Sequence, residues 1–428
     1  MTDAPARISP ADDRRREHWT RLDRRLVRPV LWLTIALSFL VIVEPSPYEF
    51  MFLVLCWAVL VRGITIPRFI APVVFLLPVM FTIGGITAVL QVVYEFDSVR
   101  YVAISMYLTI TTVVFAALVA EDPVGRLRII RSAYIVAAVI AALAAIVGYF
   151  GLVPGAKEMF TLYNRASGTF KDPNVYGPFL VFPALLLIQD LLTRQGGRIL
   201  TLAIPLGIIA VGVLLSFSRA AWAIFMVSTL LMGAMMFAFT ASPRLRLRMG
   251  IGAIAGAMAL GGLIVGLLAV PEVSVVFQER ADLSQSYDVG TTGRFAIQKR
   301  SIWDLIDQPL GMGPLQYSKV YGQDPHNVFI NSFASYGWIG GFSFITFVVL
   351  TWIVGIRYAL VRTPWQNFHF AALATFLPLS LEGFIVDIDH WRHFYLMAGL
   401  LWGMSAAAAA YRPQPPARQD RAYLRAAM

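Results

Sequence analysis

Apolar runs long enough to cross a lipid bilayer recur along the whole chain. Hydrophobic residues make up 58% of the 428 residues and charged residues only 14%, which excludes an ordinary soluble domain. Runs of about 20 apolar residues are typical of transmembrane helices. The sequence therefore predicts an all-α, polytopic integral membrane protein.

Twelve such runs can be counted. The first two are short and are expected to form a hairpin around residues 44–47. No small-residue cleavage site follows the first run, so we expect it to be retained as a helix. A transmembrane domain over 26–411 is thus predicted between two tails, 1–25 and 412–428. The predicted spans are 26–43, 48–66, 69–93, 101–120, 129–150, 175–192, 199–216, 219–240, 249–270, 326–356, 364–386 and 391–411.

Charge asymmetry predicts the orientation of these spans. The side with both termini carries 24 of the 35 Lys and Arg and 9 of the 25 Asp and Glu, so its net charge is 24 − 9 = +15. The other side carries the remaining 11 basic and 16 acidic residues, or 11 − 16 = −5. The positive-inside rule then places both termini in the cytoplasm. The net charge of +10 is explained by this topology rather than by nucleic-acid binding.

A polar stretch over 271–325 interrupts the apolar runs on the predicted outer face. It carries two polar motifs, Thr291-Thr292-Gly293-Arg294 and, at its end, Asp324-Pro325-His326-Asn327. Loops that a rigid scaffold holds in place are where chemistry concentrates. We therefore expect this face to carry the functional site.

A short amphipathic helix is predicted to follow Arg294. Phe295, Ile302, Trp303 and Ile306 have the spacing of one helical face, and Thr292 is a plausible N-cap. The helix is expected to lie on the membrane or on the bundle, with its apolar residues used for packing.

Two Asp-Pro pairs, at Asp172 and Asp324, have the pattern of an N-cap followed by Pro at the first helical position. Both predict membrane helices whose N-termini face outward. Such termini suit anions, phosphates included, although the pairs can equally be simple caps. His326 is then expected in a first turn, where the helix dipole favours a neutral ring that can act as a general base. The alternative is an ordinary interfacial histidine.

Arg219 opens the eighth run with almost no loop before it. It is expected at membrane depth near the outer face. A snorkelling side chain is one interpretation. A guanidinium placed to bind phosphate is the other, because its planar fork suits that ligand.

A metal interpretation is open for the short loop that contains Asp387 and Asp389, followed by His390. Paired carboxylates can hold a divalent ion beside a diphosphate. Charged residues are also what any short loop between two spans contains. We therefore expect no metal ligands in this chain.

Several motifs together resemble the bacterial O-antigen ligase and O-antigen polymerase superfamily over roughly residues 30–410. Their order and their placement around the large outer loop carry the resemblance. The motifs are Asn164-Arg165-Ala166-Ser167-Gly168-Thr169-Phe170 with Asp172-Pro173-Asn174, Ser218-Arg219-Ala220, Gly293-Arg294-Phe295, Pro309-Leu310-Gly311-Met312-Gly313, Pro325-His326-Asn327 and Tyr336-Gly337-Trp338-Ile339-Gly340.

The resemblance implies a twelve-helix bundle of the glycosyltransferase C type in the bacterial inner membrane. It also implies a glycan donor on undecaprenyl diphosphate, used at the periplasmic face without a metal or other cofactor. Arg219, Arg294 and His326 look like the family's catalytic residues. Arg165, Asn174 and Asn327 lie in its recurring motifs and are the expected substrate-binding residues.

Two activities within the family remain open. A ligase transfers the finished glycan to lipid A–core, and a polymerase extends lipid-linked repeats of O-antigen or exopolysaccharide. The Arg and His pattern favours the ligase, with inversion at the anomeric carbon; a protein O-glycosyl transferase is a third option. A flippase or other transporter of lipid-linked glycans is the alternative from another class. Ion-coupled pumps usually need an ionisable residue at a span centre, and none is evident here.

Overall fold

Helices form at the positions of the predicted apolar runs. The computed structural model describes residues 19–193, 199–281 and 293–412. Its elements are η1 (Asp23–Val27), α2 (Arg28–Ala36), η2 (Leu37–Phe39), α3 (Pro47–Arg62), η3 (Arg68–Ile70), α4 (Ala71–Val74), η4 (Phe75–Phe81), α5 (Thr82–Val89), α6 (Phe96–Glu121), α7 (Pro123–Tyr149), α8 (Ala156–Phe160), β1 (Thr161–Leu162), β2 (Arg165–Ala166), α9 (Pro173–Thr193), α10 (Leu200–Leu215), α11 (Arg219–Phe239), α12 (Pro243–Leu268), α13 (Pro271–Ala281), α14 (Arg294–Ile306), α15 (Tyr317–Tyr321), α16 (Val328–Ala359), α17 (Gln366–Glu382) and α18 (Arg392–Ala410).

The all-α prediction is confirmed for the described residues, where the only strands are the two-residue pair β1 and β2. Each of the twelve predicted spans contains a helix. Eight described helical segments are long and apolar enough to cross a membrane. The other four predicted spans contain shorter α-helices of 17 residues or fewer, namely α2, α3, α10 and α17. Twelve spans therefore remain a prediction.

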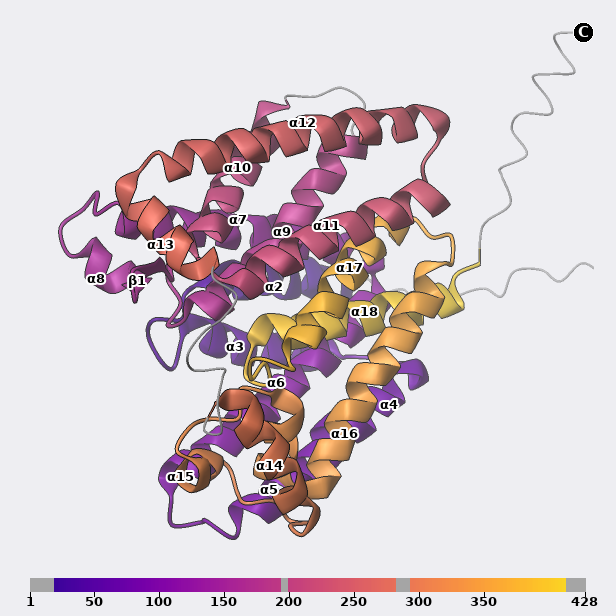
Figure 1. Cartoon of the computed structure of the whole chain (residues 1–428). Coiled ribbons are helices and arrows are strands. Elements are labelled where there is room, and N and C mark those ends of the chain that lie inside the picture. Colours follow the sequence, from indigo (N-terminus) through magenta and orange to yellow (C-terminus); the bar gives the residue numbers. More distant parts are fainter. Residues whose placement is uncertain (1–18, 194–198, 282–292, 413–428) are drawn as a thin grey trace, which may run out of the picture.

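The core of the bundle contains α18 and α6, which pack closely against each other. Glycines allow this approach: a Cβ added at Gly403 would lie 2.6 Å from the carbonyl oxygen of Ala116. At the other extreme, no residue of α12 is buried. Figure 1 shows α12 running along the edge of the bundle, apart from the central helices.

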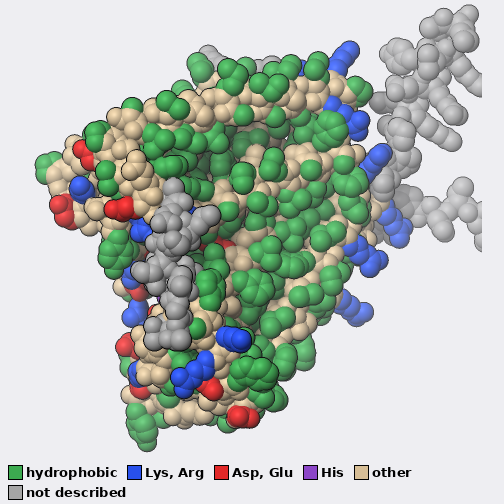
Figure 2. Space-filling view, in the orientation of Figure 1, with side chains coloured by type: hydrophobic (Ala, Val, Ile, Leu, Met, Phe, Trp, Pro, Cys, Tyr) green, Lys and Arg blue, Asp and Glu red, His purple; other side chains and the backbone are tan. Residues whose placement is uncertain are grey.

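The two ends of the bundle differ in charge. We call the end at which α9, α11, α16 and α18 begin the site end, and the other the opposite end. In the view of Figure 2, Lys and Arg side chains project from the opposite end, while acidic and basic side chains mix at the site end. This distribution follows the asymmetry expected from the loop sequences.

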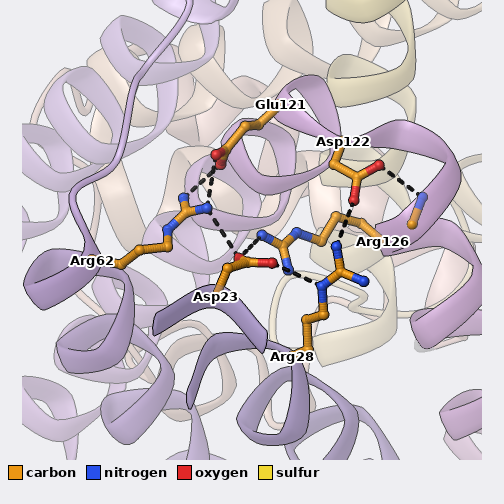
Figure 3. A network of polar contacts seen from close by, with 7 residues as sticks. Asp23, Arg28, Arg62, Glu121, Asp122 and Arg126 are labelled. Atoms are coloured by element: carbon orange, nitrogen blue, oxygen red, sulfur yellow. Dashed lines mark hydrogen bonds and ion pairs between the residues drawn. The ribbon is translucent and has the colours of Figure 1, made fainter. Parts of the chain in front are cut away.

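A polar network joins three segments at the opposite end (Figure 3). The carboxylate of Asp23 accepts hydrogen bonds from Arg62 (3.1 Å), from Arg28 (2.8 Å) and from Arg126. Arg62 also donates to both carboxylate oxygens of Glu121, at 2.7 and 2.5 Å. The guanidiniums of Arg62 and Arg126 are buried. Asp23 therefore balances charges that water does not reach.

Replacing Asp23 with Leu is expected to lower the free energy of unfolding by about 3–5 kcal/mol, because it leaves buried guanidiniums uncompensated. Thermal melting of the detergent-solubilised protein, followed by size-exclusion chromatography, measures the change. Arg28→Ala is the matched control, because the Arg28 side chain is 42% exposed and its ion pair contributes little. Equal melting temperatures for Asp23→Leu and Arg28→Ala would rule out this role.

The described parts of the polar stretch 271–325 form α13, which packs against α12, and α14 and α15, which pack against α16. The predicted amphipathic helix is confirmed as α14. The prediction of Thr292 as its N-cap is wrong, because the N-cap is Gly293; Thr291 and Thr292 themselves lie outside the described residues. The expectation that its apolar residues serve packing is wrong. Phe295, Ile302, Trp303 and Ile306 are about half exposed or more, and α14 instead packs against the bundle on the face that carries Leu305.

A break in α16 receives part of this polar stretch. Gly337 has non-helical backbone angles (φ 64°, ψ −170°), so the carbonyl of Ala334 is released and accepts from the N–H groups of Met312 (2.8 Å) and Gly313 (3.1 Å). The N–H of Trp338 donates in turn to Pro309 (2.9 Å). Two motifs far apart in the sequence, 309–313 and 336–340, thus form one interlocked unit.

Candidate functional site

Arg165 lies on a tight hairpin. β1 and β2 pair antiparallel, and the two turn residues Tyr163 and Asn164 both have positive φ, 52° and 57°. This is the geometry of a type I′ turn, which matches the twist of the flanking strands. The hairpin directs the chain back into the bundle, and the Arg165 residue is buried with 7% of its surface exposed.

The Arg165 guanidinium joins two of the sequence motifs. Its Nη2 donates to Oδ1 of Asn174 at 2.7 Å, and its Nε donates to the carbonyl oxygen of Ser216 at 3.0 Å. Asn174 stands in the first turn of α9. The predicted cap is confirmed there: α9 begins at Pro173, and the Asp172 carboxylate accepts from the N–H of Asn174 at 2.7 Å.

Arg219 is the first residue of α11, as the sequence predicts, and it is half-buried. It follows a sharp turn in which buried Phe217 has a φ of 46°. Ser218 caps the helix by accepting from the N–H of Ala221 at 3.3 Å. Because Arg165 bonds to Ser216 at the start of this turn, it braces the backbone from which Arg219 projects.

The prediction that His326 lies in a first helical turn is wrong. α16 begins at Val328, and its cap is Asn327, whose Oδ1 accepts from the N–H groups of Phe329 and Ile330, each at 3.1 Å. His326 precedes the cap, is exposed and has a φ of 46°. Asp324 and Asn327 are both good capping residues, and the contacts of Asn327 with the rest of the fold select it.

The loop between α17 and α18 supplies those contacts. The carbonyl oxygen of Gly383 accepts from the N–H of Val328 at 2.8 Å, and the Asp387 carboxylate accepts from the N–H of Asn327 at 3.1 Å. Burial raises the pKa of Asp387 well above its usual range, and the charge of Asp389 adds to this. The loop thus holds the backbone on the C-terminal side of His326.

Asp389 has protein partners of its own. Its carboxylate accepts from the hydroxyl of Tyr101 at 2.8 Å and from Nδ2 of Asn331 at 3.3 Å, and it lies 3.3 Å from Nδ1 of His390. Burial opposes ionisation, but the charge and hydrogen bond of His390 outweigh it and lower the pKa of Asp389. Across residues 19–193, 199–281 and 293–412 no group of three or more His, Cys, Asp or Glu could hold a metal.

α14 connects Arg294 to the His326 segment. Nε2 of Gln298 donates to the carbonyl oxygen of Pro325 at 2.8 Å and approaches that of His326 at 3.4 Å. Arg294 is the first residue of the same helix, one turn before Gln298. The backbone positions of Arg294 and His326 are therefore coupled through a single buried amide side chain.

One residue that the sequence analysis did not single out is Glu382, at the end of α17. It is buried, and neither of its carboxylate oxygens has a hydrogen-bond partner within the described part of the chain. Its electrostatic neighbour is Asp172, the cap of α9. Gly383, the next residue, holds Val328. Glu382 thus lies within electrostatic range of the cap of α9 and directly before the residue that holds Val328.

Two comparisons with known proteins bear on this arrangement. Residues 204–345 match the family model described as O-Antigen ligase, which confirms the resemblance to the O-antigen ligase and polymerase superfamily. The matched range includes Arg219, Arg294, His326 and Asn327. A search of the curated proteins found no match to this chain.

Proposed function

We propose that this chain is a membrane glycosyltransferase that moves a glycan from undecaprenyl diphosphate to an acceptor hydroxyl at the periplasmic face of the bacterial inner membrane. The O-antigen ligase family match of residues 204–345 supports glycan transfer by a ligase or polymerase. The observation that carries the finer proposal is the bracing of Arg219 by Arg165 at the end of the bundle that also carries His326.

In this mechanism the protein supplies charge stabilisation and a base. A sugar diphosphate is already a good leaving group, so the site must stabilise the negative charge that develops as it departs. Arg219 and Arg294 are assigned this role. His326 accepts the proton of the incoming hydroxyl while that oxygen attacks the anomeric carbon and the diphosphate leaves with its bonding electrons. Direct displacement of this kind inverts the anomeric configuration.

The other three predicted residues are assigned positioning roles by their contacts. Arg165 and Asn174 bond to each other, and Asn327 caps α16. In the proposal, Arg165 and Asn174 hold the turn before Arg219, and Asn327 fixes the backbone after His326. The carboxylates of Asp387 and Asp389 accept hydrogen bonds from protein groups. The proposal assigns charge stabilisation to the arginines rather than to a metal.

Deletion of the gene distinguishes the candidate activities. Lipid A–core without long chains, together with intact lipid-linked polymer, indicates a ligase. Single lipid-linked repeats indicate a polymerase. Lipid-linked glycan that accumulates on the cytoplasmic leaflet indicates a flippase. We expect the ligase outcome, and purified protein should then transfer glycan from the lipid-linked donor in excess chelator.

Arg165→Lys is expected to lower kcat on the order of 10²-fold, because an ammonium cannot reach Asn174 and Ser216 together and small misplacements of catalytic groups cost this much. Single-turnover transfer with purified protein measures the effect. As a positioning residue, Arg165 should change kcat more than the KM for donor. Lys171→Ala, which removes an exposed partner of Glu44, is the control. Normal kcat with a raised KM in the Arg165→Lys variant would instead indicate direct donor binding.

A further inference from the structure

α14 has three distinct sides. One side faces the bundle and contains Gln298, Ser301 and Leu305, which are 8%, 0% and 5% exposed. The hydrogen bonds of this side are internal: Ser301 accepts from the hydroxyl of Tyr317 at 2.9 Å, and Gln298 donates to Pro325. These buried hydrogen bonds therefore hold α14 in place through this side.

The second side of α14 is apolar and points away from the bundle. Phe295, Ile302, Trp303 and Ile306 are 49%, 49%, 67% and 50% exposed. At about 100° per residue these four side chains cover an arc of about 100°, the width of an apolar stripe that normally faces a core. We call these four residues the α14 stripe.

The third side of α14 is charged. Arg300 is exposed on this side, and its side chain pairs loosely with Asp304 at 4.0 Å. Lys299 is also exposed, but its position on the helix falls within the arc of the stripe. Figure 2 shows basic side chains over this region of the molecule beside apolar ones. Around α14, the side that faces the protein is thus followed by an apolar side and then by a charged side. That sequence of surfaces is typical of a helix at a membrane–water interface.

The stripe is continuous with a surface that belongs in lipid. α14 contacts α16, one of the helices long and apolar enough to cross a membrane. Nε1 of Trp338 on α16 donates to the carbonyl oxygen of Leu305 at 3.1 Å, and Trp338, Ile339 and Phe342 are exposed beside this junction. Trp303 and Trp338 are residues of the type that gathers at headgroup depth.

We propose that α14 lies in the headgroup layer of the outer leaflet, with its stripe at the boundary of the acyl chains and with Arg300 against lipid phosphates. Lys299, which lies within the arc of the stripe, extends its ammonium toward the same phosphates. Because α14 begins at Arg294 and Gln298 holds Pro325, this position of α14 places Arg294 and the His326 segment at the depth of membrane phosphates. The membrane contact itself does not depend on the proposed glycan transfer. The effect of this contact on binding of the lipid-linked donor does rest on that function.

The depth of the stripe can be measured directly. Ile302→Cys, Trp303→Cys and Asp307→Cys are prepared in a Cys56→Ala background and labelled with an environment-sensitive fluorophore. The labelled proteins are placed in nanodiscs of phosphatidylcholine and phosphatidylglycerol. Quenching by lipids with a nitroxide on the acyl chain is compared with quenching by aqueous iodide. Asp307 is the matched control, because it is exposed and immediately follows the helix.

At positions 302 and 303 we expect lipid nitroxide to quench on the order of threefold more than at 307, with iodide showing the reverse order. Equal access to iodide at all three positions would overturn the proposal. Protection from both quenchers that depends on protein concentration would also overturn it, because a second copy would then cover the stripe.

A second measurement tests whether the membrane contact of α14 affects function. The double variant Ile302→Ser and Trp303→Ser should raise the KM for lipid-linked donor on the order of tenfold, with a smaller effect on kcat. Val320→Ser, which polarises an exposed apolar residue of α15 outside the stripe, is the control. If the quenching confirms the depth of α14 but the double variant leaves the KM unchanged, the membrane contact does not contribute to donor binding. That result would overturn the inferred effect on substrate. If quenching shows that positions 302 and 303 are not in the lipid, the inference is overturned even when glycan transfer by the native protein is confirmed.

Discussion

His326→Ala is expected to abolish glycan transfer while leaving the binding of lipid-linked donor largely intact. Removing a general base typically costs about 10²–10⁴ in rate, which is enough to remove visible product from a cell. The structure holds the backbone on both sides of His326: Gln298 bonds to Pro325, and Asp387 bonds to the N–H of Asn327. The exposed His326 residue is thus carried on a segment whose backbone is held by contacts on both sides.

His326→Gln separates proton transfer from phosphate binding. Glutamine can hydrogen-bond a diphosphate but cannot accept a proton at neutral pH. Equal loss of single-turnover rate in the Ala and Gln variants, with donor binding preserved, is the expected result. Near-normal turnover in the Gln variant would show that His326 positions phosphate and that the proton goes elsewhere. Gln323→Ala, in the same loop and before the Asp324-Pro325 pair, serves as the control.

Arg219→Ala and Arg294→Ala are each expected to lower transfer on the order of 10²–10³-fold, as the loss of one donor to a developing anion does. Lysine at either position should restore activity only in part, because it keeps the charge but loses the planar fork. Long-chain glycan in complemented cells and in vitro rates, at equal protein level, measure the loss.

Arg100→Ala is the control for these variants. Arg100 belongs to the same end of the bundle, where its exposed guanidinium pairs with Glu44 at 3.1 Å. An exposed pair of this kind contributes little, so near-normal transfer is expected. Normal glycan in Arg219→Ala or Arg294→Ala would assign that arginine a snorkelling or packing role instead.

Local signals predicted some helix starts and missed others. Asp172-Pro173 and Ser218-Arg219 begin α9 and α11 as expected. At α16 two caps compete, Asp324 and Asn327, and local sequence cannot rank them. Hydrogen bonds from Val328 to Gly383 and from Asn327 to Asp387 decide the outcome, and both partners lie more than 50 residues away.

Periodicity likewise predicted α14 but not which of its sides is covered. The apolar spacing of Phe295, Ile302 and Trp303 identifies a helical face, but spacing says nothing of what lies opposite. Pro325 and Tyr317, later in the same polar stretch, offer hydrogen-bonding partners to Gln298 and Ser301, so those residues are buried and the stripe is exposed. In a membrane protein an apolar face has two possible environments, core and lipid, and sequence periodicity does not distinguish them.

The sequence alone determined the positions of the helices, the charge difference between the ends of the bundle and the family resemblance. These follow from hydropathy, from loop charges and from short motifs, all of which are local properties of the chain. Tertiary structure alone decided that Arg165 bonds to Ser216 and Asn174, that 309–313 enters the break at Gly337, and that His326 lies outside α16. Each of these depends on partners brought together by packing, because a buried polar group must find whichever acceptor the fold places beside it.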